Sequence, residues 1–301
     1  MADASTSTAL PPADGTFSLL ISPAQLQALL DSGRPCMVFD CSFDLQQPQA
    51  GQQQYVQVHI PGAVYAHLDT ALSAAADDQS PSGGRHPLPS RERFAAWLSA
   101  VGFRNDMQAV VYDRQGANYC GRLWWMLKWA GHDAVAVLDG GLPHWAAAGG
   151  ALVAGEPTPH PASHFVLHDP LRQLVDVQQV QQRLGDAQQT IIDARAPERF
   201  RGEVEPLDPV AGHIPGALNR PFGSNLGLDG RFKPAALLRA EFEALLAGRD
   251  PASVVQQCGS GVSAIPNLLA MELAGFAPTA LFAGSWSQWC SDPHRPCAQG
   301  A

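Results

Sequence analysis

Residues 254–264 read Val-Val-Gln-Gln-Cys-Gly-Ser-Gly-Val-Ser-Ala, and they predict a strand, a tight loop and a helix in immediate succession. Val254 and Val255 are β-branched, which is typical of the end of a buried strand. The apolar run from Ala264 to Ala274 predicts a helix. Cys258 therefore falls at a turn between a strand and a helix.

A thiol at that turn would face the N-terminus of the helix. Unpaired backbone N–H groups and the helix dipole favour a negative charge there. The group they would favour at Cys258 is a thiolate, which is the reactive form of cysteine. Gly259 and Gly261 allow the loop to turn its N–H groups inward, because glycine tolerates positive φ. The local sequence predicts a cysteine nucleophile in an anion-binding loop.

The composition indicates a globular protein of 301 residues, which is long enough for two domains. Hydrophobic residues make up 46% and charged residues 16%, which is not the composition of a disordered chain. The net charge of −9 and the lack of basic runs argue against nucleic acid as a partner. No apolar stretch approaches the ~20 residues of a membrane span, and residues 1–16, expected to be a loose tail, do not resemble a signal peptide. We expect a cytoplasmic protein with no membrane partner.

The six cysteines do not suggest a metal site. They are Cys36, Cys41, Cys120, Cys258, Cys290 and Cys297. None forms a CxxC pair, and their spacing is not that of zinc ligands. We expect all of them except Cys258 to be small buried hydrophobic residues.

The chain contains an internal repeat. The run His59-Ile60-Pro61-Gly62-Ala63 recurs unchanged as His213-Ile214-Pro215-Gly216-Ala217. Each half also has a matching pattern of glycine and tryptophan: Gly131, Gly140 and Trp145, then Gly275, Gly284 and Trp289. A period of roughly 140 residues indicates a duplicated domain. We expect one domain over residues 17–146, a linker rich in glycine and proline over 147–163, and a second domain over 164–301.

Each half alternates strand-like and helical runs. Strands are expected at 37–40, 109–112 and 135–138, and again at 190–193, 253–256 and 279–282. Helices are expected at 91–101, 121–130, 234–247 and 263–274. The apolar strands predict an α/β fold in which each domain has a mainly parallel sheet flanked by helices. Ligands bind such sheets at the carboxyl ends of the strands, which is where Cys258 falls.

The chain resembles the tandem-domain sulfurtransferases of the rhodanese family from about Val38 to Ala298. The resemblance is carried by the two His-Ile-Pro-Gly-Ala runs, Gly121-Arg122-Leu123-Trp124-Trp125-Met126, Asp139-Gly140-Gly141-Leu142-Pro143-His144-Trp145, Asp193-Ala194-Arg195, Arg199-Phe200 and the Cys258 loop. It implies two rhodanese-like domains, of which only the second is catalytic. The first half agrees, because Asp113 follows its strand at the place of Cys258.

The resemblance also implies a persulfide mechanism without a metal or organic cofactor. A small-molecule donor gives its sulfane sulfur to Cys258, and the persulfide passes it to a thiophilic acceptor such as cyanide, a thiol or thioredoxin. The loop is similar to that of 3-mercaptopyruvate sulfurtransferases. Thiosulfate-specific members have two cations after the cysteine, where this chain has the neutral residues Gly259 and Ser260.

The resemblance to the mercaptopyruvate enzymes implies that Ser260 and His59 are catalytic residues that work together beside Cys258. His59 belongs to the first His-Ile-Pro-Gly-Ala run. His213 has the same motif without a cysteine partner, so a structural role for His59 is equally open. Arg199 matches a substrate arginine. The substrate site would also include Gly259, Gly261, Val262 and Ser263.

Three positions depart from the family pattern. Pro48 stands where an acidic residue is expected, so Asp44 would have to replace it. A second substrate arginine is expected in residues 205–208, which read Glu-Pro-Leu-Asp. Ser263 stands in place of the usual threonine and keeps the hydroxyl. The missing arginine leaves thiosulfate open as the alternative donor.

Two other classes of protein share parts of this pattern. A phosphatase with the same strand–cysteine–loop–helix arrangement needs an arginine where Ala264 stands, so its main phosphate-binding cation is absent. A non-catalytic rhodanese-like binding module would not need Cys258, which argues against that class for the whole chain.

Overall fold

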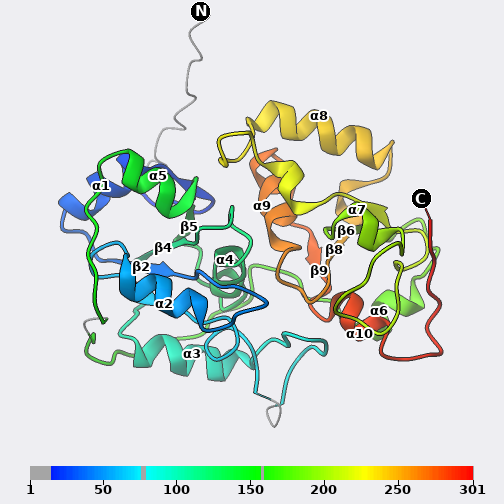
Figure 1. Cartoon of the computed structure of the whole chain (residues 1–301), viewed down its shortest axis with the longest axis horizontal. Helices are drawn as coiled ribbons and strands as arrows, with labels where there is room; N and C mark the ends of the chain where they lie inside the picture. The colour runs from blue at the N-terminus through cyan, green and yellow to red at the C-terminus, as the bar shows by residue number, and fades with distance from the viewer. Residues whose placement is uncertain (1–14, 76–78, 157–158, 301) are drawn as a thin grey trace, which may run out of the picture.

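The computed structural model describes residues 15–75, 79–156 and 159–300 (Figure 1). A loose tail was expected over residues 1–16, and residues 1–14 of it lie outside the described ranges. Two sheets form the framework, one with the strand order β1-β5-β4-β2-β3 and one with the order β7-β6-β8-β9. All of their strand pairs are parallel. The expected α/β fold with two similar halves is confirmed.

The first half contains β1 (Leu20–Ile21), β2 (Cys36–Asp40), β3 (Val64–Tyr65), β4 (Gln108–Tyr112) and β5 (Val135–Leu138). Its helices are α1 (Pro23–Asp31), α2 (Ala50–Gln57), α3 (Arg91–Ala100), α4 (Cys120–Trp129) and α5 (Gly141–Ala147).

The second half contains β6 (Thr190–Asp193), β7 (Leu218–Asn219), β8 (Val254–Gln257) and β9 (Ala280–Leu281). Its helices are α6 (Val177–Gln182), α7 (Pro197–Phe200), α8 (Ala235–Leu246), α9 (Ile265–Leu273) and α10 (Ser285–Trp289), with 3₁₀ turns η1 (Phe222–Asn225) and η2 (Pro251–Ser253).

Every strand and helix predicted from the sequence is present, and the structure has further elements that were not predicted. The predicted strands correspond to β2, β4, β5, β6, β8 and β9, and the predicted helices to α3, α4, α8 and α9. Helix α2 was missed because its sequence, Ala-Gly-Gln-Gln-Gln-Tyr-Val-Gln, buries only Gly51 and Tyr55 and so lacks an apolar stripe. Strands β3 and β7 have two residues each, too few for an alternation to be visible.

Helices α4 and α9 join the two halves (Figure 1). Every residue of α4 is buried, including the charged Arg122 and Lys128. A Cβ on Gly121 of α4 would lie only 3.2 Å from Ile265 of α9, so the glycine allows a close approach. One cluster of buried side chains continues from Trp125 in the first half to Leu268 in the second. The halves therefore share a core, which fixes the position of first-half residues at the second half's site.

Each half also extends a loop onto the other. The segment between β3 and α3 reaches the second half, where the backbone N–H of Arg85 donates to Ser287 Oγ at 3.0 Å. The segment between β7 and α8 reaches the first half, where the N–H of Phe232 donates to Asp139 Oδ1 at 2.9 Å. The two halves are thus tied by a reciprocal pair of crossing loops.

The chain beyond α5 stays in contact with the first half. Val153 forms an antiparallel bridge with His59, and the N–H of Phe165 donates to Ser99 Oγ at 2.9 Å. The domain and linker bounds expected from the sequence stay a prediction. None of the helices in the described residues is both long and apolar enough to cross a membrane.

Candidate active site

Cys258 lies directly after β8, which is an interior strand of its sheet. The residue is 1% exposed. Its backbone N–H donates to Ser285 Oγ at 3.1 Å, and its carbonyl accepts from the N–H of Trp286 at 3.0 Å. Ser285 has φ of 54°, a left-handed conformation that is uncommon outside glycine. The end of β8 and the left-handed Ser285 together fix the backbone of Cys258.

The Cys258 loop, residues 258–264, is open toward an anion. Within the described part of the chain, the backbone N–H groups of residues 259–264 donate to no acceptor. Gly261 has φ of 73°, and a Cβ there would lie 2.2 Å from the carbonyl oxygen of Ala283. Only glycine fits this position, and it lets the loop turn its N–H groups inward.

The first half shows what such a loop binds. Asp113 follows β4 as Cys258 follows β8, and its carboxylate fills the equivalent loop. It accepts from the backbone N–H groups of Gln115 at 2.9 Å, Ala117 at 3.0 Å, Tyr119 at 2.8 Å and Cys120 at 3.0 Å. The same strand–loop–helix unit therefore binds a carboxylate in the first half, whereas no described residue supplies an acceptor to the loop N–H groups in the second.

The other five cysteines are poor nucleophiles. Burial raises the pKa of Cys36 to about 12 and that of Cys290 to about 11. Burial also raises the pKa of Cys41, Cys120 and Cys297 above the ordinary value. These groups stay as thiols near neutral pH, so they lack the reactive thiolate. Cys297 is exposed rather than buried, which differs from the expectation for it.

Ser260 forms a hydrogen bond with a histidine of the first half. Its Oγ lies 2.7 Å from Nδ1 of His86, and both side chains are buried. Burial, with the charges of Arg122 and Arg85, lowers the pKa of His86 to about 3. The imidazole is therefore neutral near pH 7. Its Nε2 lies 3.6 Å from Asp69 Oδ1, which is longer than a hydrogen bond and, with a neutral ring, is not an ion pair.

His59 does not lie beside Ser260, which corrects the expected pairing. Its Nδ1 lies 2.8 Å from the carbonyl oxygen of Tyr55, and its ring stacks on Tyr55 with centroids 4.0 Å apart. His213 makes the same contacts with Phe200, at 2.8 Å and 3.8 Å. Both copies of the motif bind a helix carbonyl and stack on an aromatic ring, which is a structural role.

Asp44 does not complete the expected arrangement either. Its carboxylate accepts from the N–H groups of Gln46 at 2.8 Å and Gln47 at 3.0 Å, so it caps a local turn. His86 was missed because the resemblance was taken to place the partner of Ser260 in the first His-Ile-Pro-Gly-Ala run. The available signal was a histidine in the proline-rich run 85–89, Arg-His-Pro-Leu-Pro, which the second half does not repeat.

Arg122 brings a buried positive charge to the Cys258 loop from α4. It donates to the carbonyl oxygens of Gly261 at 3.1 Å and His86 at 2.9 Å, and to that of Leu72 at 3.3 Å. Burial lowers the pKa of Arg122 to about 9, and the nearby Cys258 acts in the opposite direction. No carboxylate of the described residues pairs with this guanidinium, so a buried positive charge lies at the Cys258 loop.

Arg199 borders the same loop from α7. Its Nη2 lies 2.6 Å from Glu205 Oε1 and 3.3 Å from Asp208 Oδ2. A Cβ on Gly259 would lie 3.7 Å from its Nη1. The structure therefore places Arg199 at the border of the Cys258 loop, which contains Ser260. Of the remaining loop residues, Val262 is buried and Ser263 is half-buried.

Comparison with known proteins gives one consistent assignment. The rhodanese-like domain family matches residues 22–148 and 176–292. A probable 3-mercaptopyruvate sulfurtransferase of Pseudomonas aeruginosa is 47% identical, over 93% of this chain and 98% of its own. A putative thiosulfate sulfurtransferase of Mycobacterium tuberculosis is 42% identical, over 94% and 97%. The solved structure of 3-mercaptopyruvate sulfurtransferase from Leishmania major has a TM-score of 0.79 at 31% identity, covering 95% of this chain and 77% of that one.

Proposed function

Because this chain belongs to the rhodanese family and is a sulfurtransferase, we propose that its donor is 3-mercaptopyruvate and that the sulfur travels as a persulfide of Cys258. Ser260 lies two residues after the nucleophile in the loop, and its hydrogen bond with His86 supports this donor most directly. A hydroxyl held by a neutral imidazole suits a reaction that releases an enolate.

In the first half-reaction the Cys258 thiolate attacks the sulfur of the donor. The carbon–sulfur bond breaks, and its electron pair moves into the keto group to give the enolate of pyruvate. One proton then converts the enolate to pyruvate, and the transferred sulfur stays on Cys258 as a persulfide. Ser260 donates a hydrogen bond to the developing enolate oxygen while His86 orients the hydroxyl.

In the second half-reaction the acceptor attacks the outer sulfur. The sulfur–sulfur bond breaks, and its electron pair returns to Cys258 as a thiolate. Cyanide would leave as thiocyanate, and a thiol would leave as a persulfide, with thioredoxin among the candidate thiols. The open N–H groups of residues 259–264 would hold the outer sulfur between the two steps, as the first-half loop holds Asp113.

Thiosulfate is the alternative donor, and one observation favours it. A relative that is 42% identical is named a putative thiosulfate sulfurtransferase. Sulfite leaves thiosulfate with the bonding electron pair and needs no proton, so this reaction would not depend on Ser260.

The test compares kcat/KM for 3-mercaptopyruvate and thiosulfate, with cyanide as acceptor. We expect a clear preference for 3-mercaptopyruvate, equal amounts of pyruvate and thiocyanate, and a gain of one sulfur atom in the mass of the protein when cyanide is omitted. Cys258→Ser should abolish all three, while Cys297→Ser, at an exposed cysteine, serves as the matched control. Turnover that persists in Cys258→Ser would reject the nucleophile, and a preference for thiosulfate would reject the donor.

We also propose a cytoplasmic location. All six cysteines lie in the described residues, and each is a free thiol. Unpaired thiols suit a reducing compartment.

A further inference from the structure

Arg85 approaches the Cys258 loop from the other half of the protein. It belongs to the crossing loop between β3 and α3, and its backbone N–H is bound by Ser287 Oγ. The N–H of Ser287 in turn donates to the carbonyl oxygen of Gly259 at 2.9 Å. A Cβ on Gly84 would lie 2.5 Å from the carbonyl oxygen of Gly284, so the crossing loop packs directly on this segment. The position of Arg85 is therefore set by the backbone that follows Cys258.

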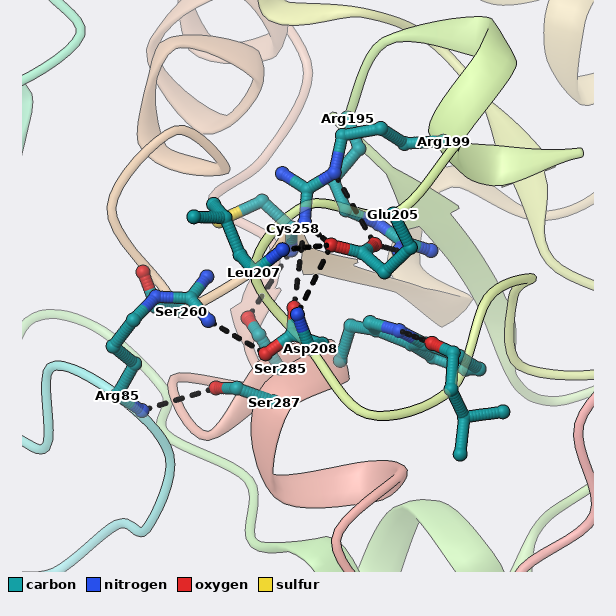
Figure 2. Close-up of polar contacts among 12 residues, drawn as sticks. Arg85, Arg195, Arg199, Glu205, Leu207, Asp208, Cys258, Ser260, Ser285 and Ser287 are labelled. Carbon is teal, nitrogen blue, oxygen red and sulfur yellow. Dashed lines mark hydrogen bonds and ion pairs between the residues drawn. The ribbon is translucent and has the colours of Figure 1, made fainter. Parts of the chain in front are cut away.

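One edge of the Arg85 guanidinium is held and the other is free. Its Nη1 lies 2.5 Å from Oδ1 of Asp208, an interaction that Figure 2 shows beside the Cys258 loop. Its Nε is buried without a hydrogen-bond partner, and its Nη2 makes no hydrogen bond within the described part of the chain. That Nη2 lies 3.0 Å from the point that a Cβ on Gly259 would occupy.

Arg199 is arranged in the same way from the opposite side. Glu205 holds its Nε at 3.2 Å and its Nη2 at 2.6 Å. Its Nη1 has no hydrogen-bond partner among the described residues and lies 3.7 Å from the same Cβ point on Gly259. Two guanidinium groups thus direct unpaired N–H donors at one place beside the residue that follows Cys258. Because Gly259 has no side chain, no Cβ occupies that point.

We propose that Arg85 is the second substrate-binding arginine of this protein and that, with Arg199, it binds the donor's carboxylate across the boundary between the halves. The proposal rests on the proposed function. It accounts for residues 205–208, where a second arginine was expected and Asp208 stands instead. Asp208 contacts both arginines, Arg85 at 2.5 Å and Arg199 at 3.3 Å, so it positions the pair instead of binding substrate.

The chemistry of the pair suits one carboxylate. Planar guanidinium groups bind carboxylates through paired N–H donors in a fixed geometry. Arg85 and Arg199 are each already paired with a buried carboxylate, Asp208 or Glu205. The four charges cancel, so the site offers directed donors without a large net positive charge. This arrangement favours a donor with a single carboxylate over doubly charged thiosulfate.

The test is the effect of Arg85→Gln on KM and kcat measured separately. We expect KM for 3-mercaptopyruvate to rise about ten- to hundredfold, the loss expected for a hydrogen bond to a charged group, with kcat within about threefold and KM for cyanide unchanged. Arg199→Gln should behave alike. Arg201→Gln is the matched control, because Arg201 pairs with Glu203 on the surface two positions away.

A charge exchange tests the role of Asp208. In the Arg85→Gln background, Asp208→Arg returns an arginine to the segment 205–208 and should recover part of the lost KM. Titration of 3-mercaptopyruvate into Cys258→Ser, with and without Arg85→Gln, measures binding free of turnover and should show the same loss.

Three outcomes overturn the proposal. An unchanged KM in Arg85→Gln, with a wild-type protein that uses 3-mercaptopyruvate, rejects the arginine pair and leaves the proposed function intact. A fall in kcat alone means that Arg85 acts through the adjacent His86. If Arg85→Gln does not fold, Arg85→Lys decides, because it keeps the charge near Asp208 and loses the forked donors; an unchanged KM there also rejects the proposal. A wild-type protein that does not use 3-mercaptopyruvate rejects the proposed function instead.

Discussion

Removing the hydroxyl of Ser260 should slow the use of 3-mercaptopyruvate far more than the use of thiosulfate. The hydroxyl is the only side-chain donor that the mechanism assigns to the enolate oxygen, and His86 Nδ1 holds it at 2.7 Å in a buried site. Loss of one such donor costs about 10²-fold in kcat. Thiosulfate releases sulfite without protonation, so Ser260→Ala should change its kcat by no more than about threefold.

The histidine should act only through the serine. His86→Leu removes Nδ1 and leaves the hydroxyl without its partner, so its kcat with 3-mercaptopyruvate should fall by a similar factor. The double variant Ser260→Ala/His86→Leu should then be no slower than Ser260→Ala alone, because the two residues form one unit. His86→Asn, whose amide can occupy the place of Nδ1, should retain part of the rate.

The assay is the initial rate of pyruvate formation from 3-mercaptopyruvate and of thiocyanate formation from thiosulfate, measured for all four variants. Equal losses with both donors would refute the reasoning, because the pair would then merely hold the Cys258 loop in shape. Losses that multiply in the double variant would show that Ser260 and His86 act independently.

Two further predictions concern stability. Ser285→Ala leaves the buried N–H of Cys258 without its acceptor and should lower the free energy of unfolding by about 2 kcal/mol. Ser285→Gly should be about 1 kcal/mol more stable than Ser285→Ala, because φ at this position is 54°; urea unfolding checks the order, and the reverse order contradicts it. The pKa of His86 is lowered from 6.5 to about 3, so between these values the unfolded chain binds the extra proton and stability is lost as the pH falls from 6.5 toward 3. Unfolding of wild type and His86→Leu across this range should show a shallower decline in the variant, and parallel curves would argue against the buried neutral imidazole.

Much of the fold could be predicted because it depends on local patterns. The β-branched runs of β4 and β8 and the apolar runs of α4 and α9 each carry their own signal, and the repeat supports them in both halves. The position of Cys258 follows from the same local pattern, since a loop between a strand and a helix places its residue at the end of the sheet.

The partners of Cys258 could not be predicted in this way. Ser260 and His86 are 174 positions apart, and Arg85 and Asp208 are 123 apart. Their meeting depends on how α4 packs on α9, and no periodicity in the sequence records that packing. The resemblance pointed to His59, whereas the repeat indicated a structural role, and both copies of the motif bind a carbonyl in the same way.

The crossing loops have a consequence for synthesis of the protein. Translation proceeds from the N-terminus, so His86 and Arg122 leave the ribosome long before Cys258. Ser285, which holds the cysteine backbone, comes later still. A nascent chain that ends between these points has either His86 and Arg122 without Cys258, or Cys258 without Ser285. It follows that Cys258 meets all of these groups only when translation is nearly complete.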